Sequence, residues 1–115
     1  MTVPFSVTRL HGLAKITLAG DFDCYNAPKI RERLFILVGS GDADLLLCLS
    51  AVEYVDSVAL ATLFAVHQRT LAHGGSLRVI CTNRQIWRAF EITGLHRAFP
   101  VYHDEITLIA SLDAK

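Results

Sequence analysis

The stretch YVDSVALATLF, residues 54–64, contains the junction that decides the fold. Two hydrophobic residues, Tyr54 and Val55, lead into an acid and a hydroxyl, Asp56 and Ser57. Asp and Ser are typical of the residue that caps the start of a helix. Beyond them, residues recurring at helical spacing predict one apolar stripe of a helix: Leu60, Leu63, Phe64, His67 and Leu71. We therefore expect a buried strand, a tight turn at Asp56-Ser57, and a packed helix.

Similar patterns extend in both directions from this junction. The run DLLLCLS, residues 44–50, is almost continuously apolar, as expected of a strand covered on both faces. Further strands are predicted at 5–10, 15–19, 77–82 and 99–102, the first two joined by a turn at His11-Gly12. Helices are predicted from Asn26 to the GSGD turn at 39–42, from Asn83 to Gly94, and after Asp104, while HGG at 73–75 ends the helix that follows Ser57.

The order of these elements indicates the fold class. Strands and helices alternate after an opening hairpin, and right-handed crossovers lay successive strands parallel. We predict an α/β fold with a mixed, mostly parallel central sheet and about four helices packed on it. Residues 1–115 are expected to form a single domain, since the length matches one ordinary core.

Composition excludes several classes of partner. Eleven basic and eleven acidic residues cancel, and no Lys/Arg run is present. We therefore expect no nucleic acid and no anionic membrane surface as the main partner. The sequence contains no window of about 18 consecutive apolar residues, so we expect no membrane insertion. The first residues, MTVPFSVTRLHG, lack the pattern of a signal peptide.

The cysteines and histidines predict neither a disulfide nor a metal site. Cys48 and Cys81 lie in apolar runs and Cys24 has no CxxC partner, which favours a reduced, cytoplasmic protein. The five histidines show no ligand spacing with cysteine, so no metal and no cofactor is expected.

An enzymatic role for Ser57 is disfavoured by its surroundings in sequence. No GxSxG elbow and no phosphate-binding glycine loop are present. His67 would lie about 15 Å further along the same helix, too far to act as a base. We therefore expect no catalytic residue, although a serine-dependent or nucleotide-hydrolysing enzyme stays as the least favoured alternative.

Several segments, taken together and in order, resemble the STAS domain, the family of bacterial anti-sigma-factor antagonists and of the cytoplasmic tails of sulphate transporters. Gly20-Asp21-Phe22-Asp23 is similar to its motif after the second strand. The strand at 44–50 followed by residues 54–57 resembles its buried strand and aspartate–serine pair. Residues 86–90 and Thr93-Gly94-Leu95 resemble its third helix and the motif after it.

This resemblance implies a function for the junction. Ser57 would be the phosphoacceptor, modified by a partner serine kinase that is also the anti-sigma factor. The unphosphorylated form would bind that partner and free the sigma factor, and a serine phosphatase would be a second partner. The implied partner-binding residues are Asp21, Asp23, Asn26, Asp56, Val58 and Ala59.

Elementary electrostatics makes such a switch reasonable. A phosphoryl group adds roughly −1.5 to −2 charge units. The carboxyl ends of parallel strands meet at one sheet edge, so Asp21 and Asp23 should lie near Asp56 and Ser57. Phosphorylation would then make an acidic surface strongly acidic and block docking without unfolding the domain.

Two alternatives stay open at this point. Asp56 and Ser57 also suit a purely structural cap, worth about 1 kcal/mol and compatible with either function, and Asp23 and Asn26 suit a turn and a helix start. The family's usual run is Asp-Ser-Ser-Gly-Leu-Gly, whereas residues 56–61 read DSVALA. The loss of the second serine and both glycines favours an unphosphorylated STAS subunit, as in stress-signalling scaffolds or lipid-transport complexes.

Overall fold

The computed structural model describes residues 4–113, which form five strands and four α-helices. The strands are β1 (Phe5–Leu10), β2 (Leu13–Phe22), β3 (Asp44–Val55), β4 (Ser76–Ile80) and β5 (Val101–Tyr102). The helices are α1 (Ala27–Gly39), α2 (Ser57–Ala72), α3 (Arg84–Thr93) and α4 (Glu105–Asp113), with a short 3₁₀ turn, η1 (Leu95–Arg97), after α3.

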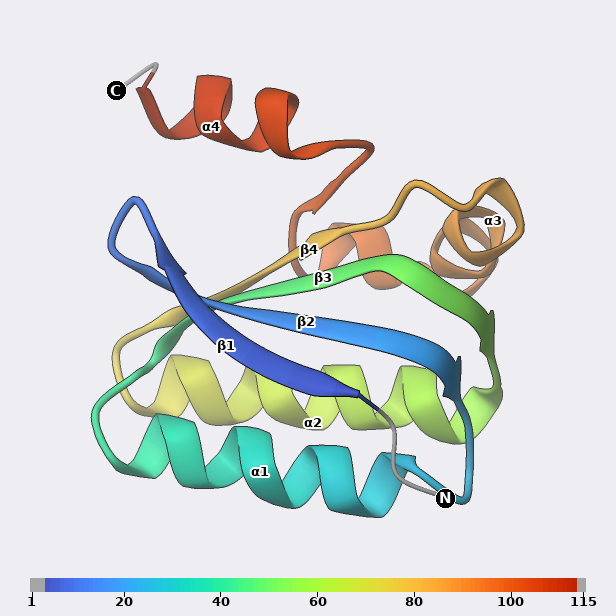
Figure 1. Cartoon of the computed structure of the whole chain (residues 1–115), viewed down its shortest axis with the longest axis horizontal. Coiled ribbons are helices and arrows are strands. Elements are labelled where there is room, and N and C mark those ends of the chain that lie inside the picture. The colour runs from blue at the N-terminus through green and yellow to red at the C-terminus, as the bar shows by residue number, and fades with distance from the viewer. Residues whose placement is uncertain (1–3, 114–115) are drawn as a thin grey trace.

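The five strands form one sheet in the order β1-β2-β3-β4-β5, so order in space follows order in the chain (Figure 1). β1 pairs antiparallel with β2, and every later neighbour is parallel. This confirms the predicted α/β fold with a mixed, mostly parallel sheet. The opening hairpin turns at His11 and Gly12, both at positive φ.

Helices cover both faces of the sheet. Figure 1 shows α1 and α2 side by side on one face and α4 on the opposite face. In β3 alternate residues point to opposite faces: Leu45, Leu47 and Leu49 join the main core, whereas Leu46 and Cys48 meet α4. The main core also contains residues from β2, α1, α2 and α3, among them Phe22, Leu34, Leu63 and Phe90.

The apolar cluster that holds α4 on the sheet is smaller than the main core on the other face. Leu108 is its only fully buried side chain and packs on Leu13, Leu46 and Ile80. An ion pair of 2.8 Å between Lys15 of β2 and Glu105 fixes the start of the helix. The α4 side of the sheet is therefore covered by a small apolar cluster and a polar tie.

Local signals in the sequence explain most helix ends. Asn83 caps α3 by accepting hydrogen bonds from the N–H groups of Gln85 and Ile86. Gly94, at φ +76°, ends that helix in the left-handed conformation that glycine adopts without strain. Both features confirm the predicted bounds of α3 to within a residue.

Two predicted strands are too short. β3 runs to Val55 rather than to residue 50, and β2 spans Leu13–Phe22 rather than 15–19. The ends of the two strands pair with each other, after register shifts between Thr17 and Ala19 and between Gly20 and Asp21. Periodicity missed this extension because a shifted register interrupts the regular alternation of buried and exposed residues.

The predicted apolar stripe of α2 is wrong for most of its members. Only Leu63 of that stripe is fully buried, whereas Phe64 is 39% and Leu71 56% exposed. The buried face instead consists of Ala59, Thr62, Leu63, Val66 and Thr70. Small and polar residues let α2 lie close to its neighbours. The two buried threonine hydroxyls donate to carbonyl oxygens of the same helix, Thr62 to Val58 and Thr70 to His67.

Among residues 4–113, we find no helix with the length and apolar character needed to cross a bilayer.

Candidate functional site

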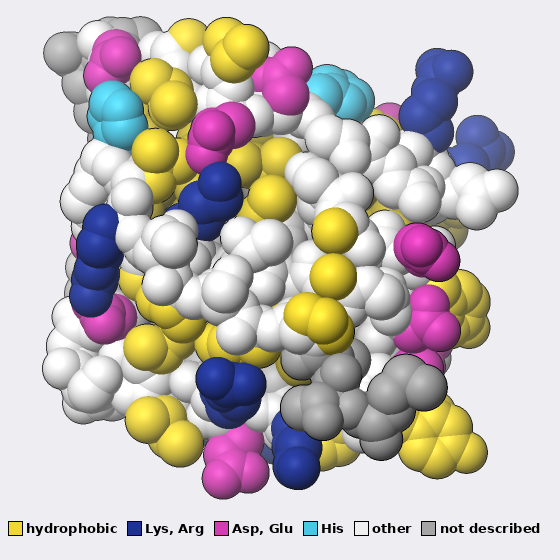
Figure 2. Space-filling view, in the orientation of Figure 1, with side chains coloured by type: hydrophobic (Ala, Val, Ile, Leu, Met, Phe, Trp, Pro, Cys, Tyr) yellow, Lys and Arg dark blue, Asp and Glu magenta, His cyan; other side chains and the backbone are white. Residues whose placement is uncertain are grey.

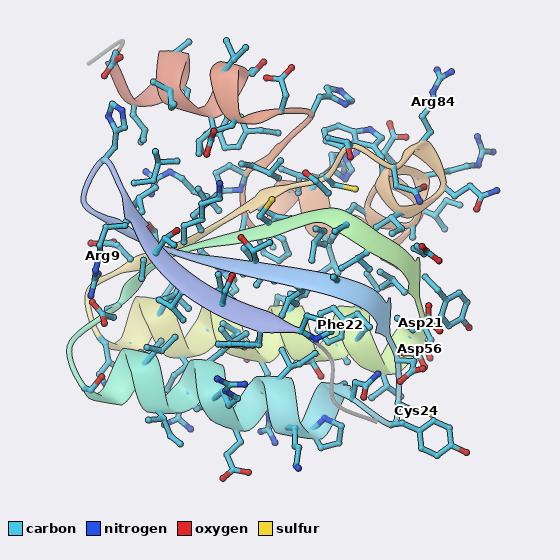
Figure 3. All side chains as sticks on the ribbon, in the orientation of Figure 1. Arg9, Asp21, Phe22, Cys24, Asp56 and Arg84 are labelled. Atoms are coloured by element: carbon cyan, nitrogen blue, oxygen red, sulfur yellow. The ribbon has the colours of Figure 1, made fainter. Side chains whose placement is uncertain are left out.

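Ser57 lies at the carboxyl end of β3, where it is the first residue of α2 and is exposed. The neighbouring strand β2 ends at the same edge of the sheet, because Asp21 pairs with Tyr54 and Phe22 with Val55. The β2–α1 loop and the β3–α2 junction are therefore adjacent, as Figure 3 shows for Asp21, Cys24 and Asp56. Residues far apart in the chain thus form one surface around Ser57.

Asp56 connects the two segments. One carboxylate oxygen, Oδ1, accepts a hydrogen bond from the N–H of Ala59 at 2.9 Å and caps α2. The other, Oδ2, accepts from the N–H of Cys24 in the β2–α1 loop at 2.8 Å. Both carboxylate oxygens are thus used, and the orientation of Ser57, the next residue, is fixed relative to the loop.

The β2–α1 loop is ordered by its own polar side chains. Asp23 Oδ1 accepts from the N–H groups of Tyr25 and Asn26, each at 3.1 Å. The Asn26 side chain in turn donates to the carbonyl oxygen of Asp21 at 2.9 Å. Asp23 and Asn26 therefore have clear structural roles in the loop, whereas the exposed Asp21 carboxylate faces solvent.

These carboxylates leave the edge acidic. Within residues 4–113, the ion pairs are Arg9–Asp42, His11–Asp113 and Lys15–Glu105, so none involves Asp21, Asp23 or Asp56. Acidic side chains gather along this edge in Figure 2, at the place where Figure 3 labels Asp21 and Asp56. A partner docking at this edge would meet carboxylates that form no ion pair within the described residues.

Val58 and Ala59 differ in their availability to a partner. Val58 is 42% exposed, which suits a contact residue. Ala59 is completely buried in the main core, so its side chain cannot contact a partner in this conformation. The expectation that Ala59 binds a partner is therefore corrected, since only its backbone N–H takes part in the site, as the donor to Asp56.

A shallow apolar groove begins at Ser57. It has a volume of about 250 Å³ and is lined by Ser57, Leu60, Ala61 and Phe64 of α2 together with Thr93 and Leu95. Sequence reasoning missed this groove because it assigned Phe64 to the buried stripe. The signal that could have indicated it is the Thr93-Gly94-Leu95 motif, which brings the end of α3 against α2.

The surroundings of Ser57 do not form a catalytic arrangement. His67 packs against Phe64 and Phe99, with ring centroids 6.0 and 5.5 Å apart, and its buried Nδ1 has no hydrogen-bond partner among the described residues. It therefore belongs to an aromatic cluster. No group of three or more potential metal ligands occurs in residues 4–113. What the site offers is an exposed hydroxyl on the rim of an acidic and partly apolar surface.

Comparison with known proteins identifies similar chains. The family model of the STAS domain matches residues 5–107. The anti-sigma-B factor antagonist of Bacillus subtilis is 35% identical over 95 residues, which cover 83% of this chain and 86% of that protein. The anti-sigma-B factor antagonist of Listeria monocytogenes is 31% identical, with 70% of each chain covered.

Solved structures show the same fold. An anti-sigma factor antagonist from Mycobacterium paratuberculosis superposes with a TM-score of 0.85 at 24% identity, covering 96% of this chain and 93% of that one. The anti-sigma factor antagonist SpoIIAA in its unphosphorylated form gives a TM-score of 0.72 at 15% identity, covering 97% and 100% of the two chains.

Proposed function

Because this chain belongs to the STAS domain family and is homologous to bacterial anti-sigma factor antagonists, we propose that it is a docking switch controlled by phosphorylation of Ser57. In this proposal the unphosphorylated form binds an anti-sigma factor that is also a serine kinase, and so frees a sigma factor. The phosphorylated form does not bind. The observation that carries the proposal is the exposed Ser57 hydroxyl on the rim of the apolar groove, beside the Asp56 that links α2 to the β2–α1 loop.

Anti-sigma factor antagonists are non-enzymatic regulators. In the proposed cycle the partner kinase supplies the nucleotide and the metal, and this protein supplies only the acceptor hydroxyl. A serine phosphatase would restore the docking form.

The surface around Ser57 suits reversible docking. The groove and the exposed Val58 provide apolar area that a partner can cover, while Asp21 and Asp56 provide negative charge for a basic partner surface. We propose that Asp21, Asp23, Asn26, Asp56 and Val58 contribute to the interface, with Asp23 and Asn26 acting through the shape of the loop.

A phosphoryl group on Ser57 would prevent docking by charge and by bulk. It would add roughly −1.5 to −2 charge units at the groove rim, next to Asp56. A hundredfold loss of affinity corresponds to about 2.7 kcal/mol, and burying an unpaired anion against apolar groups costs at least that much.

The fold should tolerate the modification. Ser57 is exposed at the amino end of α2, where the first N–H groups have no acceptor within the helix and the helix dipole favours an anion. The change would therefore act at the surface and leave the core unchanged.

The proposal is tested by incubating the purified protein with ATP and each serine kinase of the anti-sigma type encoded beside it. We expect a mass gain of about 80 Da, one phosphoryl group, that maps to Ser57. Ser57→Ala should abolish the gain, whereas Ser40→Ala, a matched change at another exposed serine, should leave it intact. Modification of Ser57→Ala to the same extent would overturn the assignment.

A second measurement tests the charge mechanism. Ser57→Asp should weaken binding to the same kinase by about a hundredfold, which corresponds to about 2.7 kcal/mol. Its thermal midpoint should stay near that of the unmodified protein. Equal binding by Ser57→Asp and the wild type would reject docking control by charge.

One observation favours a second candidate, an unphosphorylated STAS subunit of a stress-signalling scaffold or lipid-transport complex. Ala61 lines the groove, so a methyl group occupies a position where the family's usual run has glycine. A kinase that needs close approach of its backbone would be hindered there. Under this alternative the kinase experiment gives no modification, while a stable complex still forms through the groove.

A further inference from the structure

A second pocket lies where α3 begins, beside the ends of β4 and β5. Its volume is about 540 Å³, within the range of sites for small molecules. Thr82 follows β4 by two residues and His103 follows β5 directly, and both line the pocket. The pocket therefore has the size of a ligand site and lies at the carboxyl edge of the sheet.

Two arginines give this pocket its charge. Arg84 and Arg88 both line it and lie one helical turn apart on α3. In the part of the chain that the structure describes, neither guanidinium lies within ion-pairing distance of a carboxylate. Figure 3 shows Arg84 extending into solvent, and Figure 2 shows Lys/Arg side chains projecting at the same corner. Both guanidiniums are thus available to a ligand.

The placement of these arginines is unfavourable for the helix itself. Like charges four residues apart destabilise a helix, and the first turn of α3 contains no acidic residue, although the helix dipole favours one there. The N–H groups of Gln85 and Ile86 already donate to Asn83, so the side chains and not the helix end provide the positive site. Local conflicts of this kind are expected at functional positions.

One wall of the pocket is aromatic. The rings of Trp87 and His103 stack with their centroids 3.9 Å apart and their planes 24° from parallel. Each ring restrains the other, so this wall has a fixed shape against which a flat or apolar group can pack.

Glu91 also lines the pocket, one turn beyond Trp87. Its carboxylate would repel an anion, so the negative group of a ligand should lie toward Arg84 and Arg88. We propose that this pocket binds a small organic anion, in which a phosphate or carboxylate contacts the two arginines and a flat or apolar body packs beside Trp87 and His103.

The chain offers a specific probe of this site, because Trp87 is its single tryptophan. Its fluorescence would be followed at constant ionic strength during titration with phenyl phosphate, inorganic phosphate and benzyl alcohol. We expect a saturable change with phenyl phosphate, a several-fold weaker one with inorganic phosphate, and the weakest with benzyl alcohol.

Three variants should differ in their effect on phenyl phosphate binding. Arg84→Gln with Arg88→Gln should weaken phenyl phosphate binding by about 10-fold or more, since charge-assisted hydrogen bonds are lost. Glu91→Gln should tighten it. Arg97→Gln, which removes one positive charge at an exposed arginine outside the pocket lining, should have no effect.

Three results would overturn the site. The first is the absence of a saturable change with phenyl phosphate, in fluorescence and in the amide NMR signals of Arg84 and Gln85. The second is unchanged binding by the double arginine variant. The third is benzyl alcohol binding as tightly as phenyl phosphate, which would indicate an apolar pocket. No kinase is used, so each result is independent of the role proposed for Ser57.

Discussion

The carboxylate of Asp56 accepts a hydrogen bond from the backbone N–H of Cys24 at 2.8 Å, across 32 residues of sequence. The same carboxylate caps α2 through Ala59. One side chain therefore fixes both the helix that begins with the proposed acceptor and the loop that lies beside it.

Replacement of Asp56 tests this double role. Asp56→Ala should lower the free energy of unfolding by about 1–2 kcal/mol, because the cap and the loop contact are lost together. Urea unfolding measures the change. Asp21→Ala, at an exposed acid nearby, should change stability by less than about 0.5 kcal/mol. Equal stability of the two variants would show that the two hydrogen bonds accepted by Asp56 do not stabilise the fold.

The glycine pair between α2 and β4 gives a steric prediction. A methyl group on Gly75 would overlap the backbone of Ala43, whereas one on Gly74 would meet no atom. Gly75→Ala should therefore cost about 3 kcal/mol, since backbone cannot move as readily as a side chain. Gly74→Ala should cost about 1 kcal/mol, for its φ of +75° alone. Thermal unfolding of both variants checks the order, and a reversed order would contradict the packing described for this turn.

Asp104 gives a prediction about pH. Hydrogen bonds from Thr107, first of all from its backbone N–H, lower the pKa of this carboxyl below its usual 3.8. A carboxyl with a lowered folded-state pKa stabilises the fold above its unfolded pKa and loses that contribution as the pH falls through the folded value. Asp104→Ala should therefore be less stable than the wild type at neutral pH, and the difference should shrink below about pH 4. Unfolding curves across this range measure it, and a constant difference would count against a charged cap.

The three thiols should react at very different rates. Cys24 is exposed, whereas Cys48 and Cys81 are buried, and burial raises the pKa of Cys81 to about 11. Since the thiolate is the reactive form, a thiol reagent should label one cysteine in the folded protein and three after unfolding. Cys24→Ser should remove the fast reaction. Rapid labelling of that variant would mean that the core opens readily.

The sequence indicated the fold well where side-chain chemistry is local. The caps at Asp56 and Asn83 and the αL glycine at residue 94 are short-range features, and all three lie where they were predicted. The buried face of α2 was predicted poorly, because Ala59 and Thr62 carry little hydrophobic signal although they pack closely.

Part of the candidate site was also predictable from the sequence. Asp21, Asp56 and Ser57 come together because Asp21 lies at the carboxyl end of β2 and the other two follow β3, its parallel neighbour, which topology alone implies. The groove depends on how the end of α3 meets α2, and the pocket beside α3 depends on the stacking of Trp87 on His103. Such contacts join distant segments, and neither periodicity nor spacing reports them.

The order of strands in the sheet has a consequence for biosynthesis. Each strand is added next to the one made before it, and none has to insert between two already paired. During translation every strand after β1 therefore leaves the ribosome with a neighbouring strand already synthesised, so the sheet can grow in the direction in which the polypeptide is made.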